Sequence, residues 1–163
     1  MTNRKIELRR WSVISSKPFD TVLATIEGAI GRPNMAEFGA RMTAATTLDE
    51  MKTIVCESVG EFGLMEFMRL DQGAVLIKAG VDGNPRSVRI ILGNPLIMQS
   101  MVRLVADAGS YAPVTVLIDQ RTDGVHLSYD ETVGALATYE NAEALKIARD
   151  LDSKVETLLQ IAV

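Results

Sequence analysis

The chain is poor in the residue types on which most metal and cofactor chemistry depends. Its 163 residues include one cysteine, Cys56, and one histidine, His126. A single cysteine cannot form an intramolecular disulfide framework, and one cysteine with one histidine cannot supply the ligand set of a structural zinc site. We therefore expect no metal and no cofactor. The scarcity of cysteine also fits a reducing, cytoplasmic compartment.

Aromatic residues and clustered positive charge are scarce as well. Phe, Trp and Tyr make up 5% of the chain, and its 17 basic and 21 acidic residues give a net charge of -4. Nucleic-acid binding requires clustered Lys and Arg or stacking aromatics, so we expect no nucleic-acid partner. The nearest approach to a basic patch, Arg9-Arg10-Trp11, is short and falls in a predicted strand.

Long hydrophobic runs are missing too. No segment approaches the roughly 18 apolar residues of a membrane span, and the charged residues 1–7 lack the apolar core of a signal peptide. Apolar residues nevertheless make up 47% of the chain, with a mean hydropathy of +0.14. We expect a cytoplasmic protein outside the membrane, with one domain over residues 1–163. Part of its apolar surface is expected to be covered in a homo-oligomer, most simply a dimer.

Hydrophobic periodicity predicts an α+β domain in the first half of the chain. Residues 7–14 alternate as a strand does, and apolar residues over 19–30 fall on one face of a helix that follows Pro18. The least periodic stretch, Arg32 to Thr46, is interpreted as a loop with a helical turn that could act as a lid. Thr47-Leu48-Asp49-Glu50 then has the spacing of a capping box and predicts a further helix.

The second half predicts an antiparallel sheet packed by helices. Turn signals at Asp71-Gln72-Gly73 and Asp82-Gly83-Asn84-Pro85 separate β-rich runs and indicate a meander. The predicted segments are β runs over 64–70, 74–81 and 87–92, a helix over 95–106, a hairpin over 114–130, a short helix over 131–138 capped by Asp130, and a long helix from Asn141.

Several short motifs occur in an order that resembles the bacterial family called domain of unknown function 302. They are Phe62-Gly63 before a strand ending Arg69-Leu70-Asp71, then Gly93-Asn94-Pro95, Ala112-Pro113-Val114-Thr115-Val116-Leu117, Asp123-Gly124 and Leu127-Ser128-Tyr129. The resemblance spans roughly residues 8 to 160 and implies a fold similar to half of the TATA-binding-protein saddle, usually dimeric and without the DNA-binding role. It brings no general catalytic mechanism. The Arg32 to Thr46 region looks longer than the family's usual connection.

The passage Gly93-Asn94-Pro95 is the best ligand corner in the sequence. Asn94 can cap a helix whose first residue is Pro95, and the free backbone N–H groups there suit a carboxylate or phosphate. Arg89 lies a few residues upstream, and Tyr129 offers a further polar anchor. The alternative is a plain capped turn that binds nothing.

Two other residues are candidates for proton transfer. Glu66 lies among large apolar residues, where burial would raise its pKa and suit it to act as a general acid or base. His126 faces the opposite side of its strand from Val125 and Leu127, and could act as a general base. Both could equally be structural or solvent-facing. Haem binding through His126 is a minor alternative, because the chain lacks a Cys-x-x-Cys-His signature.

Two functional hypotheses follow. The first is a small-molecule binding protein whose partly apolar and perhaps anionic ligand contacts Arg89, Gly93, Asn94 and Tyr129. The second is a cofactor-independent enzyme, an isomerase, lyase or hydrolase, in which Glu66 or His126 transfers protons. The absence of nucleotide, phosphate-loop and metal motifs leaves an enzyme only the chemistry that amino-acid side chains can perform. The binding protein is the favoured hypothesis.

Overall fold

One antiparallel sheet organises the molecule. The computed structural model describes residues 3 and 5–163, so Met1, Thr2 and Arg4 of the N-terminal segment considered above lie outside the described residues. The strands are β1 (Arg10–Ser15), β2 (Met65–Asp71), β3 (Ser87–Gly93), β4 (Val114–Arg121) and β5 (Gly124–Asp130). Their spatial order is β1-β5-β4-β3-β2, which leaves β1 and β2 at the edges of the sheet.

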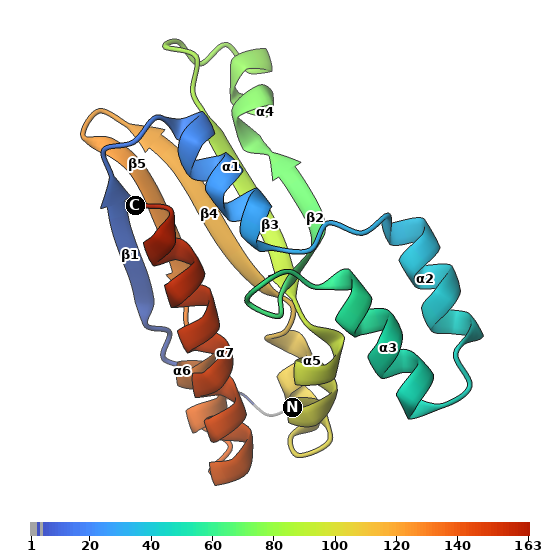
Figure 1. Cartoon of the computed structure of the whole chain (residues 1–163). Coiled ribbons are helices and arrows are strands. Elements are labelled where there is room, and N and C mark those ends of the chain that lie inside the picture. The colour runs from blue at the N-terminus through green and yellow to red at the C-terminus, as the bar shows by residue number, and fades with distance from the viewer. Residues whose placement is uncertain (1–2, 4) are drawn as a thin grey trace.

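Two helices, α1 (Phe19–Ala29) and α7 (Ala142–Ile161), lie across one face of this sheet (Figure 1). The remaining helices are α2 (Met35–Ala44), α3 (Leu48–Ser58), α4 (Gln72–Lys78), α5 (Pro95–Val102), α6 (Thr132–Ala137) and the short 3-10 helix η1 (Ala106–Ser110). In Figure 1, α4 lies at one end of the sheet, α5 and α6 lie at the other end, and α2 and α3 form a hairpin beside the sheet. None of the helices in the described part of the chain could span a membrane.

The core forms between the sheet and the α1–α7 layer because the strands alternate. Val116 and Ile118 on β4 and Leu127 on β5 are fully buried under α1 and α7. The residues between them point to the other side, which we call the open face and which carries Arg89, Thr115, Leu117, His126 and Ser128. Such a half-covered antiparallel sheet needs an apolar face and a polar face, which is the pattern in the sequence.

The predicted α+β class and antiparallel sheet are confirmed, as are several local predictions. The hairpin of β4 and β5 forms around Asp123-Gly124, with Gly124 at a φ of 141°. Thr47 and Glu50 make the predicted capping box, and Asn94 caps α5 by accepting a hydrogen bond from the Leu96 N–H. These features depend on neighbours in the sequence, so local patterns predict them.

The predicted strand over 74–81 is wrong, because this segment forms helix α4. Asp71 caps the helix by accepting a hydrogen bond from the Ala74 N–H at 2.8 Å. As a result β2 pairs directly with β3, and α4 with its following loop replaces the middle strand of the predicted meander. A short apolar run fits a helix or a strand equally well, and the cap at Asp71 decides between them.

The prediction of a loop with a helical turn over residues 32–46 underestimates the helix, because α2 extends over 10 of these residues. Asn34 caps this helix by accepting hydrogen bonds from the N–H groups of Ala36 and Glu37. Phe38 of α2 is buried in a small second core with Ile54, Val55 and Met65. The predicted helix over 95–106 is shorter than expected, since α5 ends at Val102 and η1 follows from Ala106.

Candidate functional site

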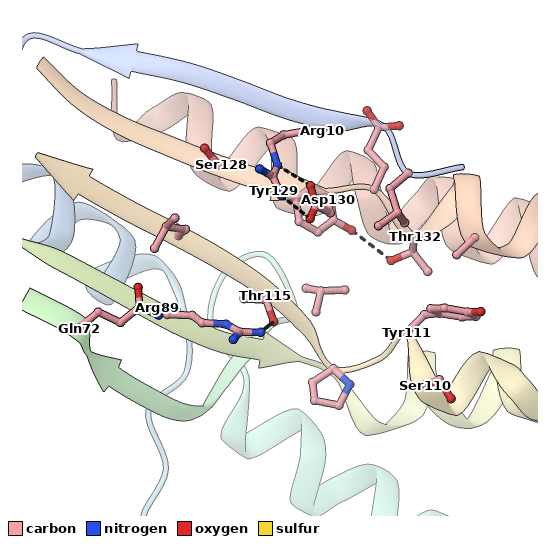
Figure 2. A pocket seen from close by; sticks show the side chains of 16 residues that line it. Arg10, Gln72, Arg89, Ser110, Tyr111, Thr115, Ser128, Tyr129, Asp130 and Thr132 are labelled. Carbon is pink, nitrogen blue, oxygen red and sulfur yellow. Dashed lines mark hydrogen bonds and ion pairs between the residues drawn. The ribbon is translucent and has the colours of Figure 1, made fainter. Parts of the chain in front are cut away.

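A cavity of about 440 Å³ opens on the open face of the sheet over β3, β4 and β5 (Figure 2). Its volume falls in the range of about 300 to 1,000 Å³ that is typical of small-molecule sites. The polar residues that line it are Arg10, Gln72, Arg89, Ser110, Tyr111, Thr115, Ser128, Tyr129, Asp130, Glu131 and Thr132. Apolar surface comes from Leu8, Pro113, Leu117 and Ala135.

A row of directly opposed residues forms the floor of the cavity. Arg89 on β3 is paired in register with Leu117 on β4, which is paired in turn with Ser128 on β5. Because opposed residues of an antiparallel sheet point to the same face, a guanidinium, an aliphatic side chain and a hydroxyl lie side by side. Arg89 Nη2 also donates to Thr115 Oγ1 at 3.4 Å. The floor therefore offers charge, apolar contact and hydroxyl groups together.

An ion pair between two neighbouring strands forms one side of the cavity. Arg10 on β1 donates from Nε to Asp130 Oδ1 at 2.6 Å and from Nη2 to Asp130 Oδ2 at 2.8 Å. The Arg10 hydrogen bonds hold the pKa of Asp130 below its ordinary value. Asp130 therefore does not cap α6 as the sequence predicted, because its carboxylate is occupied by Arg10.

Helix α6 forms another side of the cavity, through Thr132 and Ala135, and a residue of α7 holds it in position. Asp152 accepts hydrogen bonds from the N–H groups of Thr132 and Val133, both at 2.9 Å, and from the Tyr129 hydroxyl at 2.5 Å. Burial raises the pKa of Asp152 and that of Tyr129 above their ordinary values. The Tyr129 hydroxyl thus serves the fold, although the residue lines the cavity.

Of the two described arginines that line the cavity, Arg10 is paired with an acid and Arg89 is not. The strands carry four arginines, and the three besides Arg89 pair with acids, namely Arg10 with Asp130, Arg69 with Glu66 and Glu27, and Arg121 with Asp119. Arg89 makes no ion pair within residues 3 and 5–163. The two carboxylates that line the cavity are both paired, because Glu131 accepts a hydrogen bond of 2.7 Å from Arg9 Nε. An anion would therefore meet an uncompensated guanidinium.

The ligand residues predicted from the sequence separate into two pairs. Arg89 and Tyr129 line the cavity, while Gly93 and Asn94 are not among its lining residues. Both polar atoms of the Asn94 side chain are engaged, since Oδ1 accepts from the Leu96 N–H and Nδ2 donates to the Gly63 carbonyl oxygen, both at 2.8 Å. A Cβ on Gly93 would lie 3.4 Å from Pro113, so this corner is closely packed.

Glu66 belongs to a charge network on the helix-covered side of the sheet. Arg69 donates from Nε and Nη2 to its two carboxylate oxygens at 3.0 and 2.7 Å, and also pairs with Glu27 of α1. Arg32 approaches Glu66 at 3.6 Å and Glu27 at 3.5 Å. Two arginines therefore contact the Glu66 carboxylate, and Glu66 does not line the cavity.

His126 faces the open side of the sheet, as predicted, but lies outside the cavity. Its Nε2 is 2.8 Å from Asp123 Oδ1, and this contact holds the pKa of Asp123 below its ordinary value. Glu66 and His126 thus lie on opposite faces of the sheet and are not brought together. Among the described residues, no group of three or more His, Cys, Asp and Glu side chains is arranged to hold a metal ion.

Most of the cavity residues were missed by reasoning from the sequence. The alternation of β4 and β5 could have identified Thr115, Leu117 and Ser128 as sharing the face of His126. No local signal could have brought Arg10 to Asp130 or Gln72 to the same cavity, because these contacts join segments that are far apart along the chain.

Comparisons with known proteins show which family this chain matches. The model of a family described as "Domain of unknown function DUF302" matches residues 40–162. A solved structure, that of an uncharacterized conserved DUF302 protein from Bacillus stearothermophilus, is similar with a TM-score of 0.65 at 12% identity, covering 94% of this chain and 98% of that chain. At this identity the likeness concerns the fold alone. No match was found among the curated proteins.

Proposed function

The chain belongs to the DUF302 family, and from this premise we propose that it binds a small, partly apolar anion in the cavity on the open face. The observation that carries the proposal is the position of Arg89. It is the strand arginine without an acidic partner in the described residues, and it projects from the floor of the cavity. The family brings no established chemistry, so the proposal rests on the cavity itself.

The chemistry of the cavity floor supports a ligand with an anionic end and an apolar end. A guanidinium can donate two parallel hydrogen bonds to a carboxylate, phosphate or sulfonate, and such charge-assisted bonds are stronger than neutral ones. Leu117 and Pro113 offer apolar surface beside it, and the hydroxyls of Thr115 and Ser128 can turn to donate or accept. A small organic acid with an apolar body fits this combination.

The alternative of a cofactor-independent enzyme remains a prediction, as does haem binding through His126. Neither Glu66 nor His126 lines the cavity; Glu66 pairs with Arg69, and His126 contacts the Asp123 carboxylate. General acid–base catalysis needs a group within hydrogen-bond reach of the substrate, so a ligand in this cavity favours binding over proton transfer by these two residues.

We further propose that the protein acts as a homodimer in the cytoplasm, without a metal, cofactor or nucleic acid. The scarcity of cysteine and histidine and the dispersed charges support this proposal, as they did at the level of the sequence. Exposed aliphatic side chains also support the dimer, since Val75 and Met68 are 66% and 53% exposed.

A pair of small probes tests the binding proposal. Benzenesulfonate combines an apolar ring with an anion that stays charged at every practical pH, and benzenesulfonamide is its neutral counterpart. In a heteronuclear NMR titration, we expect benzenesulfonate to shift the amide signals of Arg89, Thr115 and Ser128, and benzenesulfonamide to bind at least about tenfold more weakly.

Two arginine variants provide the matched comparison for this titration. Arg89→Gln should weaken benzenesulfonate binding by roughly tenfold or more, because it removes the unpaired guanidinium. Arg121→Gln should leave the affinity unchanged, because Arg121 also belongs to a strand but pairs with Asp119 and lies outside the cavity. Equal binding by the wild type and Arg89→Gln, or shifts confined to another surface, would contradict the proposal.

A further inference from the structure

Exposed aliphatic side chains gather at one end of the sheet. Of the eleven large hydrophobic residues that are exposed in the described part of the chain, six lie between positions 68 and 81. Five of them, which we call the α4 patch, are Met68, Leu70, Val75, Leu76 and Val81, with exposed fractions between 39% and 66%. The sixth, Ile77, lines a hollow with Phe19 and Leu23 of α1 and is not counted in the patch. The patch residues belong to the edge strand β2, to α4 and to the loop that follows, which form one end of the molecule in Figure 1.

We infer that the α4 patch is the surface on which a second copy of this chain docks, with the two α4 helices antiparallel across a two-fold axis. The inference rests on the homodimer proposed above and names its contact surface. A two-fold axis makes the same patch face itself, so a single cluster of apolar residues is sufficient to form the interface.

The amount of apolar surface is of the right order for such a contact. A fully exposed aliphatic side chain offers on the order of 100 Å² of apolar area. Five half-exposed side chains therefore offer on the order of 250 Å² per copy, which is a substantial share of the apolar area in a typical interface of about 800 Å² per partner. Isolated surface aliphatics such as Leu48, on α3, offer no comparable cluster.

The charges at the two ends of α4 favour the antiparallel arrangement. Asp71 precedes the helix and Lys78 is its last residue, and neither forms a salt bridge within the described residues, although Arg86, which pairs with Asp20, interacts with Asp71 at longer range. A helix of seven residues is about 10 Å long, so two antiparallel copies bring Lys78 of each next to Asp71 of the other. Opposed helix dipoles add to this attraction.

The same charges disfavour a lipid surface as the occupant. Helices that lie on membranes carry several Lys and Arg residues beside their apolar face. The α4 patch is bordered by Lys78 and by the acidic residues Asp71 and Asp82, and the whole chain has a net charge of -4. A second copy of the chain matches this mixture of charges better than an anionic bilayer does.

The docked copy would border the ligand cavity. Leu70 of the patch is paired in register with Arg89 of the cavity floor, and Gln72, which lines the cavity, is the first residue of α4. The partner would therefore cover the Arg89 end of the cavity and limit the size of the ligand there.

Sedimentation velocity on the full chain tests the inference. At about 20 µM we expect the wild type to be a dimer and the variant Val75→Asp/Leu76→Asp to be a monomer, with a dissociation constant raised at least about a hundredfold. Leu48→Asp is the matched control, because Leu48 is 52% exposed but lies on α3, and it should remain a dimer. Lys78→Glu and Asp71→Asn should each weaken the dimer about threefold to tenfold, the second while keeping an oxygen that can cap α4.

Each outcome distinguishes the two proposals. A monomeric wild type overturns this inference and the homodimer together, and its sedimentation with phosphatidylserine vesicles would indicate a lipid surface instead. A dimeric wild type whose affinity is unchanged in Val75→Asp/Leu76→Asp overturns the α4 patch alone. Thermal melts establish that the variants fold, and Val75→Gln, which adds no charge, should weaken the dimer in the same direction.

Discussion

The carboxylate of Asp152 accepts a hydrogen bond of 2.5 Å from the hydroxyl of Tyr129, and this contact joins α7 to the end of β5. The same carboxylate caps α6 through the N–H groups of Thr132 and Val133. One buried side chain therefore fixes the position of the helix that forms a side of the proposed ligand cavity. The position of α6 therefore depends on a single carboxylate that accepts all three hydrogen bonds, from the Tyr129 hydroxyl and from the two N–H groups of α6.

We expect Asp152→Ala to lower the free energy of unfolding by about 3 kcal/mol or more, because it leaves a hydroxyl and two N–H groups buried without an acceptor. Tyr129→Phe should cost only about 1 kcal/mol, because it removes a single donor. Urea denaturation measures both values. Asp150→Ala, on the exposed side of the same helix, is the control. An Asp152→Ala variant as stable as Asp150→Ala would contradict the proposed role.

The pKa of Asp152 gives a second prediction. Burial raises the pKa of this carboxyl in the folded state above its ordinary value of about 3.9. The folded protein therefore binds the proton more readily than the unfolded chain does, and the contribution of this group to stability increases as pH falls from neutral through the raised pKa. Asp152→Asn lacks this titration, so the wild type should become more stable relative to the variant as pH falls from neutral toward about 3.9.

The pKa of Asp130 is shifted in the opposite direction, so its effect occurs in a different range of pH. The hydrogen bonds from Arg10 lower the pKa of Asp130, so its contribution to stability is present above about pH 3.9 and is lost below it.

The two carboxylates can therefore be told apart by their ranges of pH. If the stability difference between wild type and Asp152→Asn is constant above about pH 4, the raised pKa of Asp152 is contradicted.

Two glycines should respond in opposite ways to substitution by alanine. A Cβ on Gly31 would lie 1.8 Å from the Ser58 carbonyl oxygen, where two chain segments cross at the base of the α2–α3 hairpin. Gly31→Ala should therefore lower the free energy of unfolding by at least about 3 kcal/mol. Gly28, within α1, has open space around its Cβ position, so Gly28→Ala should raise it by about 0.5 to 1 kcal/mol. Equal effects of the two substitutions, measured by thermal unfolding, would contradict the close crossing.

Glu66 and His126, the candidates for proton transfer, give a fourth prediction. Glu66→Gln and His126→Asn should leave the affinity for benzenesulfonate unchanged, because neither residue lines the cavity. Glu66→Gln should lower stability by about 1 kcal/mol, since Arg69 loses a paired carboxylate at a partly exposed site. The affinity is measured by the same NMR titration. A loss of about tenfold in the affinity of either variant for benzenesulfonate would indicate that the ligand binds near that residue.

Local signals in the sequence determined much of the fold. The alternation of β4 and β5, the Asp123-Gly124 turn, the capping box at Thr47 and the cap at Asn94 each depend on residues within a few positions of one another. Such interactions are encoded in the order of the residues, so the α+β class and the hairpin could be predicted without a structure.

The tertiary structure decided what local patterns leave open. The run 74–81 fits a strand or a helix, and only in the folded chain does α4 replace the middle strand, with β2 and β3 paired directly. Arg89 and Glu66 are both charged residues of strands, yet Arg89 is left without an acid while Glu66 meets two arginines. Contacts between segments far apart along the chain decide which charged side chains form ion pairs. The packing of the whole sheet determines those contacts.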